Sequence, residues 1–102
     1  MELLSILHAL GIPAAYMKFD HVMTPPYAVY YGDGQEQFTA DDTPYVKKNL
    51  YTLEYYFAEK SATREQELEE ALTAAGFAYD KSADAYISDE KVSVIYYTTW
   101  RK

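Results

Sequence analysis

The longest strand-like stretch of the chain runs from residue 45 to residue 59, YVKKNLYTLEYYFAE, with no Gly or Pro inside it. From residue 51 to residue 57 the odd-numbered positions carry Tyr, Leu, Tyr and Phe, and the even-numbered ones carry Thr, Glu and Tyr. This alternation is typical of a half-buried strand. At about 3.3 Å per residue the stretch would span roughly 50 Å, far more than a usual strand of about 5–6 residues. The strand therefore either bends, or its first half leaves the domain as an arm.

The composition indicates one domain with a single core, because 102 residues are too few for two. Tyrosine is unusually frequent, at 12 residues. Its large ring and polar tip suit both sheets and interfaces. The net charge of −7 argues against non-specific binding to nucleic acid or to anionic membranes.

The absence of cysteine excludes disulfides, a thiolate nucleophile and a Cys-based metal site. The first residues, MELLSILHALGIP, lack a basic region and a long apolar run, so no signal or membrane helix is predicted. We expect a soluble protein that is made in the cytoplasm.

Two segments have the spacing of amphipathic helices, and each is followed directly by a Gly that can end it. Leucines at positions 3, 4, 7 and 10 predict a first helix over residues 2–10. The second is predicted over residues 64–75, where Thr63 and Gln66 match a capping box.

The remaining predicted elements are strands. Pro25-Pro26 favours an extended entry into the strand at 27–31, and Gly32-Asp33-Gly34 predicts a turn after it. Residues 35–39 then either pair back as a short strand or begin a wide loop. The other predicted strands are residues 14–19, 50–57, 77–80, 85–88 and 92–100.

The predicted order is α-β-β-(β)-β-α-β-β-β, which defines an α+β fold. Two helices with one apolar stripe each can cover only one face of such a sheet, so we expect a two-layer sandwich on a mainly antiparallel sheet. The opposite face, rich in Tyr, would be exposed in a monomer. A large exposed aromatic face usually marks a partner surface.

No catalytic, cofactor-binding or metal-binding residues are predicted. His8 falls on the first helix and His21 in a loop beside Asp20, without further ligands nearby. The acidic residues gather in turns, where carboxylates normally cap backbone amides and face water. Their spacing is not that of a calcium loop. They are Asp33, Asp41 and Asp42 in one group, and Asp80, Asp84 and Asp89 in another. The protein is therefore not expected to be an enzyme.

Two segments resemble a known family: PPYAVYYGDG at residues 25–34 and DDTPYVKKNLYTLEYYFAEK at residues 41–60. They resemble small proteins encoded among the tail and head-completion genes of long-tailed phages and prophages of Gram-positive bacteria. Within that set the chain is most similar to the tail-terminator family. The resemblance covers nearly the whole chain and rests on the order of elements and their composition, without an invariant motif.

The resemblance implies a structural virion protein that caps the tail tube and joins it to the head connector. It implies a homo-oligomeric ring, a hexamer in this family, that contacts tail-tube and head-completion proteins. The location would be the virion, and the host bacterial cytoplasm during assembly. No membrane and no specific nucleic acid is expected as partner, and an acidic lumen would let DNA pass without sticking.

The predicted arm spans residues 32–49, because residues 45–49 are too polar for a core and the preceding loop is too polar to pack. The residues expected at the interface are Tyr30, Asp33, Phe38, Asp41, Asp42, Tyr45, Lys47, Lys48 and Tyr56. An alternative interpretation is a ferredoxin-like binding module for a protein or nucleic-acid partner.

Overall fold

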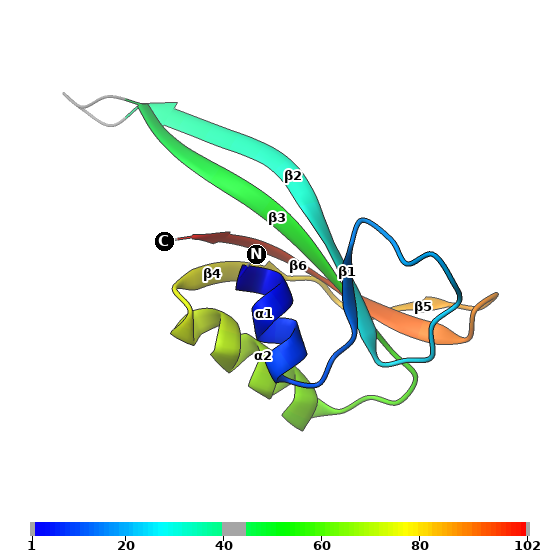
Figure 1. The fold of residues 1–102 in the computed structure, drawn as a ribbon. Coiled ribbons are helices and arrows are strands. Elements are labelled where there is room, and N and C mark those ends of the chain that lie inside the picture. The colour runs from blue at the N-terminus through cyan, green and yellow to red at the C-terminus, as the bar shows by residue number, and fades with distance from the viewer. Residues whose placement is uncertain (1, 40–44, 102) are drawn as a thin grey trace.

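In the computed structural model, residues 2–39 and 45–101 are described, and they form two helices packed on one face of a six-stranded sheet (Figure 1). This arrangement confirms the predicted α+β fold. The elements in chain order are α1 (Glu2–Ala9), β1 (Ala14–Tyr16), β2 (Tyr27–Thr39), β3 (Tyr45–Phe57), α2 (Ala62–Ala74), β4 (Phe77–Lys81), β5 (Ala85–Ile87) and β6 (Val92–Arg101).

The long strand β3 occupies the middle of the sheet, whose strand order is β1-β2-β3-β6-β4. Strand β5 also pairs with β6, farther along the edge that β4 occupies. All pairs are antiparallel except β1 with β2, which run parallel. The mainly antiparallel sheet is thus as predicted, and β3 is its central strand.

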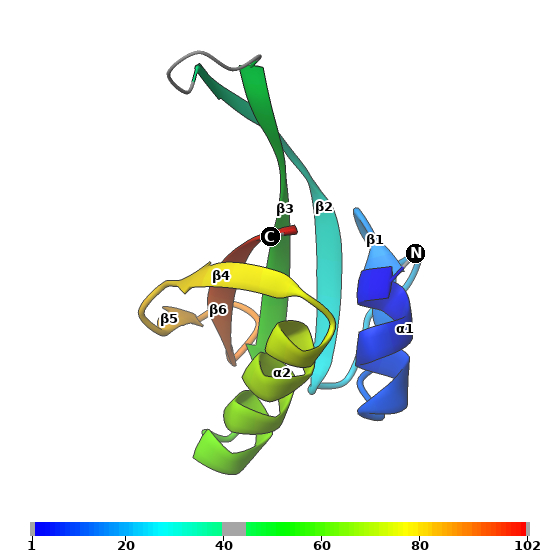
Figure 2. The same ribbon diagram turned by 90° about the vertical axis from the view of Figure 1, so that its left-hand side faces the viewer.

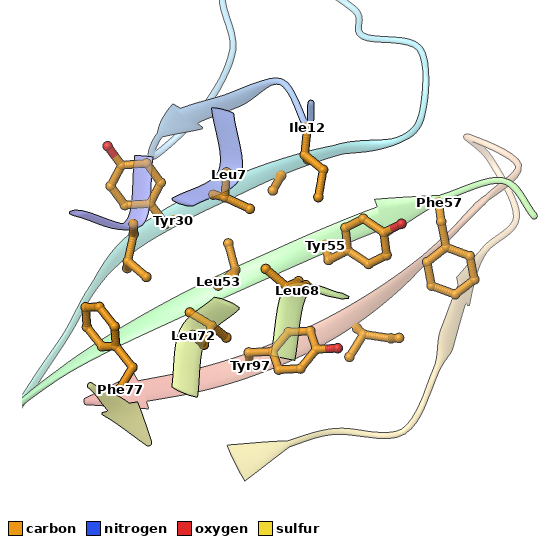
Figure 3. Close-up of a cluster of buried hydrophobic side chains, with 13 residues drawn as sticks. Leu7, Ile12, Tyr30, Leu53, Tyr55, Phe57, Leu68, Leu72, Phe77 and Tyr97 are labelled. Atoms are coloured by element: carbon orange, nitrogen blue, oxygen red, sulfur yellow. The ribbon is translucent and has the colours of Figure 1, made fainter. Parts of the chain in front are cut away.

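The core lies between the helices and the odd-numbered side of β3 (Figure 3). Leu7 of α1 and Leu68 and Leu72 of α2 are fully buried against Leu53 of β3 and Tyr97 of β6. Burying one such leucine side chain contributes about 1.5–3 kcal/mol. The alternation of residues 51–57 therefore separates a core face from an open face, as the sequence predicts.

The predicted turn at Gly32-Asp33-Gly34 is wrong, because β2 runs through it as one strand. The ladder with β3 shifts between Gly32 and Gln35, where β2 contains one extra residue. Gly34 has a φ of 90°, a conformation that glycine adopts without steric penalty. The Thr52 hydroxyl donates a hydrogen bond to Asp33 at 2.9 Å beside this shift. The glycines therefore form a β-bulge.

The predicted capping box of α2 is also wrong, because the N-cap is Ser61 and the helix begins at Ala62. Ser61 has φ −138° and ψ 101°, and its Oγ accepts a hydrogen bond from the Arg64 amide at 3.2 Å. Its extended backbone is the conformation that an N-cap requires. Thr63 instead lies inside the helix, on its exposed surface.

Strand β1 is shorter than predicted and ends at Tyr16. Met17 follows with a φ of 70°, so the chain leaves the strand direction there. The Met17 amide donates a hydrogen bond to the Tyr30 carbonyl at 2.9 Å, which fixes this exit against β2. Residues 17–26 then cross to the sheet face that lacks the helices before β2 begins.

Strands β2 and β3 extend together beyond the rest of the sheet (Figures 1 and 2). Strand β6 pairs with β3 only from residue 51 onward, and β1 pairs with β2 only up to residue 30. Beyond these points residues 35–39 of β2 pair only with residues 45–49 of β3 in the described ladders; we call these two segments the arm. The molecule measures 51 Å along its longest axis and 25 Å along each of the others.

Candidate interaction site

The face of the sheet opposite the helices, here called the open face, carries alternate side chains of β2, β3 and β6. Two rows of residues that are neighbours across the strands define its centre. In one row Tyr27 of β2 lies beside Tyr56 of β3, and in the other Glu54 of β3 lies between Val29 of β2 and Tyr96 of β6. Val29 is 8% exposed, whereas Tyr96 is 39% exposed. The open face is thus partly covered, and its tyrosines reach solvent.

Glu54 lies at the centre of this face and is held by two tyrosines of its own sheet. The Tyr31 hydroxyl donates to Oε2 at 2.5 Å, and the Tyr56 hydroxyl donates to Oε1 at 2.6 Å. Hydrogen bonds to a carboxylate are short and about twice as strong as neutral ones. They fix the orientation of Glu54 without neutralising its charge.

An aromatic cluster continues from Tyr56 toward the segment that follows β1. The rings of Tyr27 and Tyr56 are stacked, with centroids 4.8 Å apart and planes 15° apart. Phe19 places its ring at 87° to Tyr27, and His21 packs edge-on against Phe19. Such pairs contribute roughly 0.5–1.5 kcal/mol beyond the area that they bury. The segment after β1 is therefore anchored on the open face by Phe19.

A groove with a volume of about 740 Å³ runs between this segment and the sheet. Its apolar walls include Phe19, Tyr27, Val29, Tyr56 and Val92. Its acidic residues come from three separate parts of the chain and are Asp20, Glu54, Asp89 and Glu90, whereas its basic residues are Lys18 and His21. We call it the acidic groove.

Among the side chains that the structure describes, no ion pair joins a carboxylate of the acidic groove to a cation. The ion pairs there join Lys60, Lys81 and Arg101 to other acids. Burial raises the pKa of Tyr27, and the charges of Glu90 and Glu54 raise it further. The charges of both carboxylates therefore reach the Tyr27 ring.

The tyrosines that hold Glu54 are also poor acids. Burial raises the pKa values of Tyr31 and Tyr56 well above the usual 10.0, and the hydrogen bond to Glu54 and its charge raise them further. Ionising either tyrosine would remove a donor from Glu54 and add a like charge beside it. The two hydrogen bonds that Tyr31 and Tyr56 donate to Glu54, here called the tyrosine clamp, therefore remain intact at physiological pH.

We expect the substitution Glu54→Gln to lower the pKa values of Tyr31 and Tyr56 toward 10.0. Burial would still hold them above that value, because it is the larger cause. Titration of ring-labelled tyrosines by NMR, in the wild type and in Glu54→Gln, measures the change residue by residue. Glu67→Gln, on the exposed side of α2, is the matched control. Unchanged titration curves for both tyrosines would show that neither is hydrogen-bonded to Glu54, contrary to the tyrosine clamp.

Three of the side chains predicted at an interface are described, and they lie in different places. Tyr56 lies on the open face, and Asp33 is exposed beside the bulge. Tyr30 instead faces the helices, is 4% exposed and packs edge-on against Tyr16 at 5.5 Å. It is a core residue, so its expected interface role is corrected. Because consecutive strand residues face opposite ways, its neighbour Tyr31 faces outward.

The other predicted interface residues belong to the arm or to its tip. Phe38 lies in β2, and Tyr45, Lys47 and Lys48 lie in β3. Asp41 and Asp42 are outside the described residues. The structure therefore separates the expected interface into the open face and the arm.

The acidic groove was not predicted from the sequence. The sequence places Asp20 and His21 in a loop and Asp89 in a turn, without indicating that they meet. Their convergence depends on the course of residues 17–26 over the sheet. Glu54 carried a weak signal, since it is a charged residue inside an otherwise aromatic strand face.

Within the described ranges, no group of three His, Asp or Glu side chains is arranged to hold a metal ion. Neither helix is long and apolar enough to cross a membrane. No protein-family model matches the chain, and no curated protein matches it.

Proposed function

We propose that the protein is a structural subunit of a phage or prophage virion that resembles a tail terminator. Copies of the chain would form a ring, a hexamer by that resemblance, which caps the tail tube and joins it to the head connector. The role is mechanical and involves no catalysis. The subunit would assemble in the cytoplasm of the host bacterium and remain in the virion.

The observation that carries the proposal is the arm. An isolated two-stranded ribbon is marginally stable in water, and its unpaired backbone groups favour pairing with another chain. Here the ribbon continues from the sheet by five paired positions, Gln35↔Asn49 to Thr39↔Tyr45. A paired extension of this kind suits a subunit that reaches its neighbour in an assembly.

The open face supports the same class of function. Half-buried tyrosines bring large contact areas at a small entropic cost, as interfaces prefer. A sheet with helices on one side only leaves this second face available to a partner.

The test is assembly of the purified protein. Size exclusion with light scattering is expected to give a ring-sized species or an association that increases with concentration. Adding the protein to polymerising tail-tube protein from the same genome is expected to shorten the tubes. A strict monomer at high concentration that leaves tube length unchanged would overturn the proposal.

The alternative is a ferredoxin-like module that binds a protein or a nucleic acid, and the tyrosines of the open face are the observation in its favour. Single-stranded nucleic acid stacks on such rings when cations lie around them. Glu54 at the centre, with Asp89 and Glu90 at the rim, repels phosphate instead. Binding to single-stranded RNA or DNA with a steep dependence on salt would favour this alternative.

A further inference from the structure

The arm carries two adjacent cations in a chain of opposite net charge. Lys47 and Lys48 lie in β3 opposite Gln37 and Glu36 of β2, so the paired positions of the arm carry two Lys against one Glu, and the basic side chains lie on its β3 strand. The whole chain has 9 Lys and Arg residues against 16 Asp and Glu residues. Two copies of such a chain repel each other unless a basic part of one copy meets an acidic part of the next.

The acidic groove provides such a part. Among the described residues no ion pair joins its carboxylates to a cation, and the Tyr31 and Tyr56 hydroxyls hold Glu54 in a fixed orientation. Stacked beside it are the rings of Tyr27 and Tyr56. Both a carboxylate and the face of an aromatic ring attract an ammonium group, the ring by roughly 0.5–2 kcal/mol.

The arm and the acidic groove lie at opposite ends of the molecule. Figure 1 shows the arm leaving one end, whereas residues 17–26 and the turn between β5 and β6 lie at the other. The long axis of 51 Å separates these ends, so the arm of one copy cannot enter its own groove. A contact between these two different surfaces joins copies head to tail, which closes into a ring or continues as a filament.

We propose that the arm of one copy docks in the acidic groove of the next copy, with one lysine of the arm, Lys47 or Lys48, received by Glu54 and the stacked rings of Tyr27 and Tyr56, since consecutive strand residues face opposite ways. The inference rests on the proposed ring-forming function and specifies which two surfaces meet. Asp20, Asp89 and Glu90 form the acidic rim that attracts the basic strand. The apolar walls at Phe19, Val29 and Val92 cover part of the arm's ribbon.

The test uses two variants of the whole chain in which charged side chains are replaced by uncharged ones. They are Glu54→Gln in the groove and Lys47→Gln/Lys48→Gln in the arm. Each is expected to weaken self-association by at least about tenfold, the effect of losing a charge-assisted hydrogen bond. Glu67→Gln on α2 is the matched control and is expected to assemble like the wild type. Circular dichroism verifies that each variant is folded, and the arm variant alters no residue of the body.

Mixing the two variants gives the sharper result. The Glu54→Gln copy keeps an intact arm, and the arm variant keeps an intact groove, so one wild-type contact can form. The mixture is therefore expected to give a one-to-one dimer that grows no further. A mixture that stays monomeric, or variants that assemble like the wild type, would overturn the docking proposal and leave the ring open to other contacts. A wild type that stays monomeric would overturn the proposed function itself.

Discussion

Replacing Leu53 with Ala is expected to lower the free energy of unfolding by about 2–5 kcal/mol, the range for a fully buried leucine in a packed core. Leu53 is 0% exposed and lies in the central strand, between the leucines of both helices and Tyr97 of β6. A domain of this size is stable by only about 5–15 kcal/mol. Loss of the Leu53 side chain therefore removes a large part of the free energy of unfolding. Chemical denaturation followed by circular dichroism measures this change.

Leu50→Ala is the matched control, because it changes the same residue type in the same strand. Leu50 is only half-buried and lies near the start of the arm. Its substitution is expected to cost clearly less than that of Leu53, since less apolar surface returns to water. Equal effects of the two substitutions would contradict the assignment of Leu53 to the common core of both helices.

The layer structure was predictable because it depends on local patterns. The alternation in residues 51–57 and the leucine spacing in both helices each select one buried face, and the glycines after the helices select their ends. Gly11 and Gly76 have φ values of 75° and 91°, as expected at helix ends. These signals require no knowledge of distant residues.

Other features depended on choices that local patterns leave open. Ser61 and Thr63 are both suitable caps, and the extended backbone at Ser61 decides between them. A Gly-Asp-Gly sequence suits a turn and a bulge equally, and the continuing ladder with β3 decides for the bulge. Tyr30 and Tyr31 are adjacent, so composition does not indicate which of them enters the core.

The acidic groove was beyond prediction for a different reason. Its residues come from the segment after β1, from β3 and from the turn after β5, and only the three-dimensional course of residues 17–26 brings them together. The functional resemblance to tail terminators likewise rests on the order of elements and remains a proposal. The sequence places Lys47 and Lys48 in the arm, but the acidic groove that we propose as their binding site is visible only in the structure.

Removing both lysines that face Glu65, by Lys60→Met/Lys81→Met, is expected to lower the free energy of unfolding by about 3–5 kcal/mol, the range for a buried charge left without its partner. The Glu65 side chain is only 4% exposed. Its carboxylate contacts Lys60 Nζ at 2.8 Å and Lys81 Nζ at 3.0 Å. Each single substitution leaves the other lysine beside Glu65, so only the double substitution removes both of these cations from the carboxylate. Chemical denaturation measures the loss.

Adding Glu65→Leu to the double variant separates charge from packing. The buried carboxylate is then gone, so stability is expected to recover in part. Lys81 also pairs with Glu69 at 2.8 Å, and that loss remains. A triple variant no more stable than the double variant would show that the lysines act through packing of their alkyl chains, contrary to the prediction.

The pH dependence of stability distinguishes the ionic contribution further. Burial disfavours ionised Glu69, but hydrogen bonds from Lys81 and Tyr97 outweigh it and lower its pKa below 4.5. Its contribution is therefore present above pH 4.5 and is lost as the pH falls through the lowered pKa. Hydrogen bonding to Glu69 raises the pKa of Lys81 above 10.5, so that contribution is lost only as the pH rises through this raised value. To keep Glu65 from titrating, the comparison uses Lys60→Met/Glu65→Leu with and without Lys81→Met. The variant that lacks Lys81 is expected to show a shallower fall in stability below pH 4.5, because Glu69 then gains less by ionising. If stability falls equally in these two variants as the pH is lowered, the Lys81–Glu69 pair contributes nothing to folding.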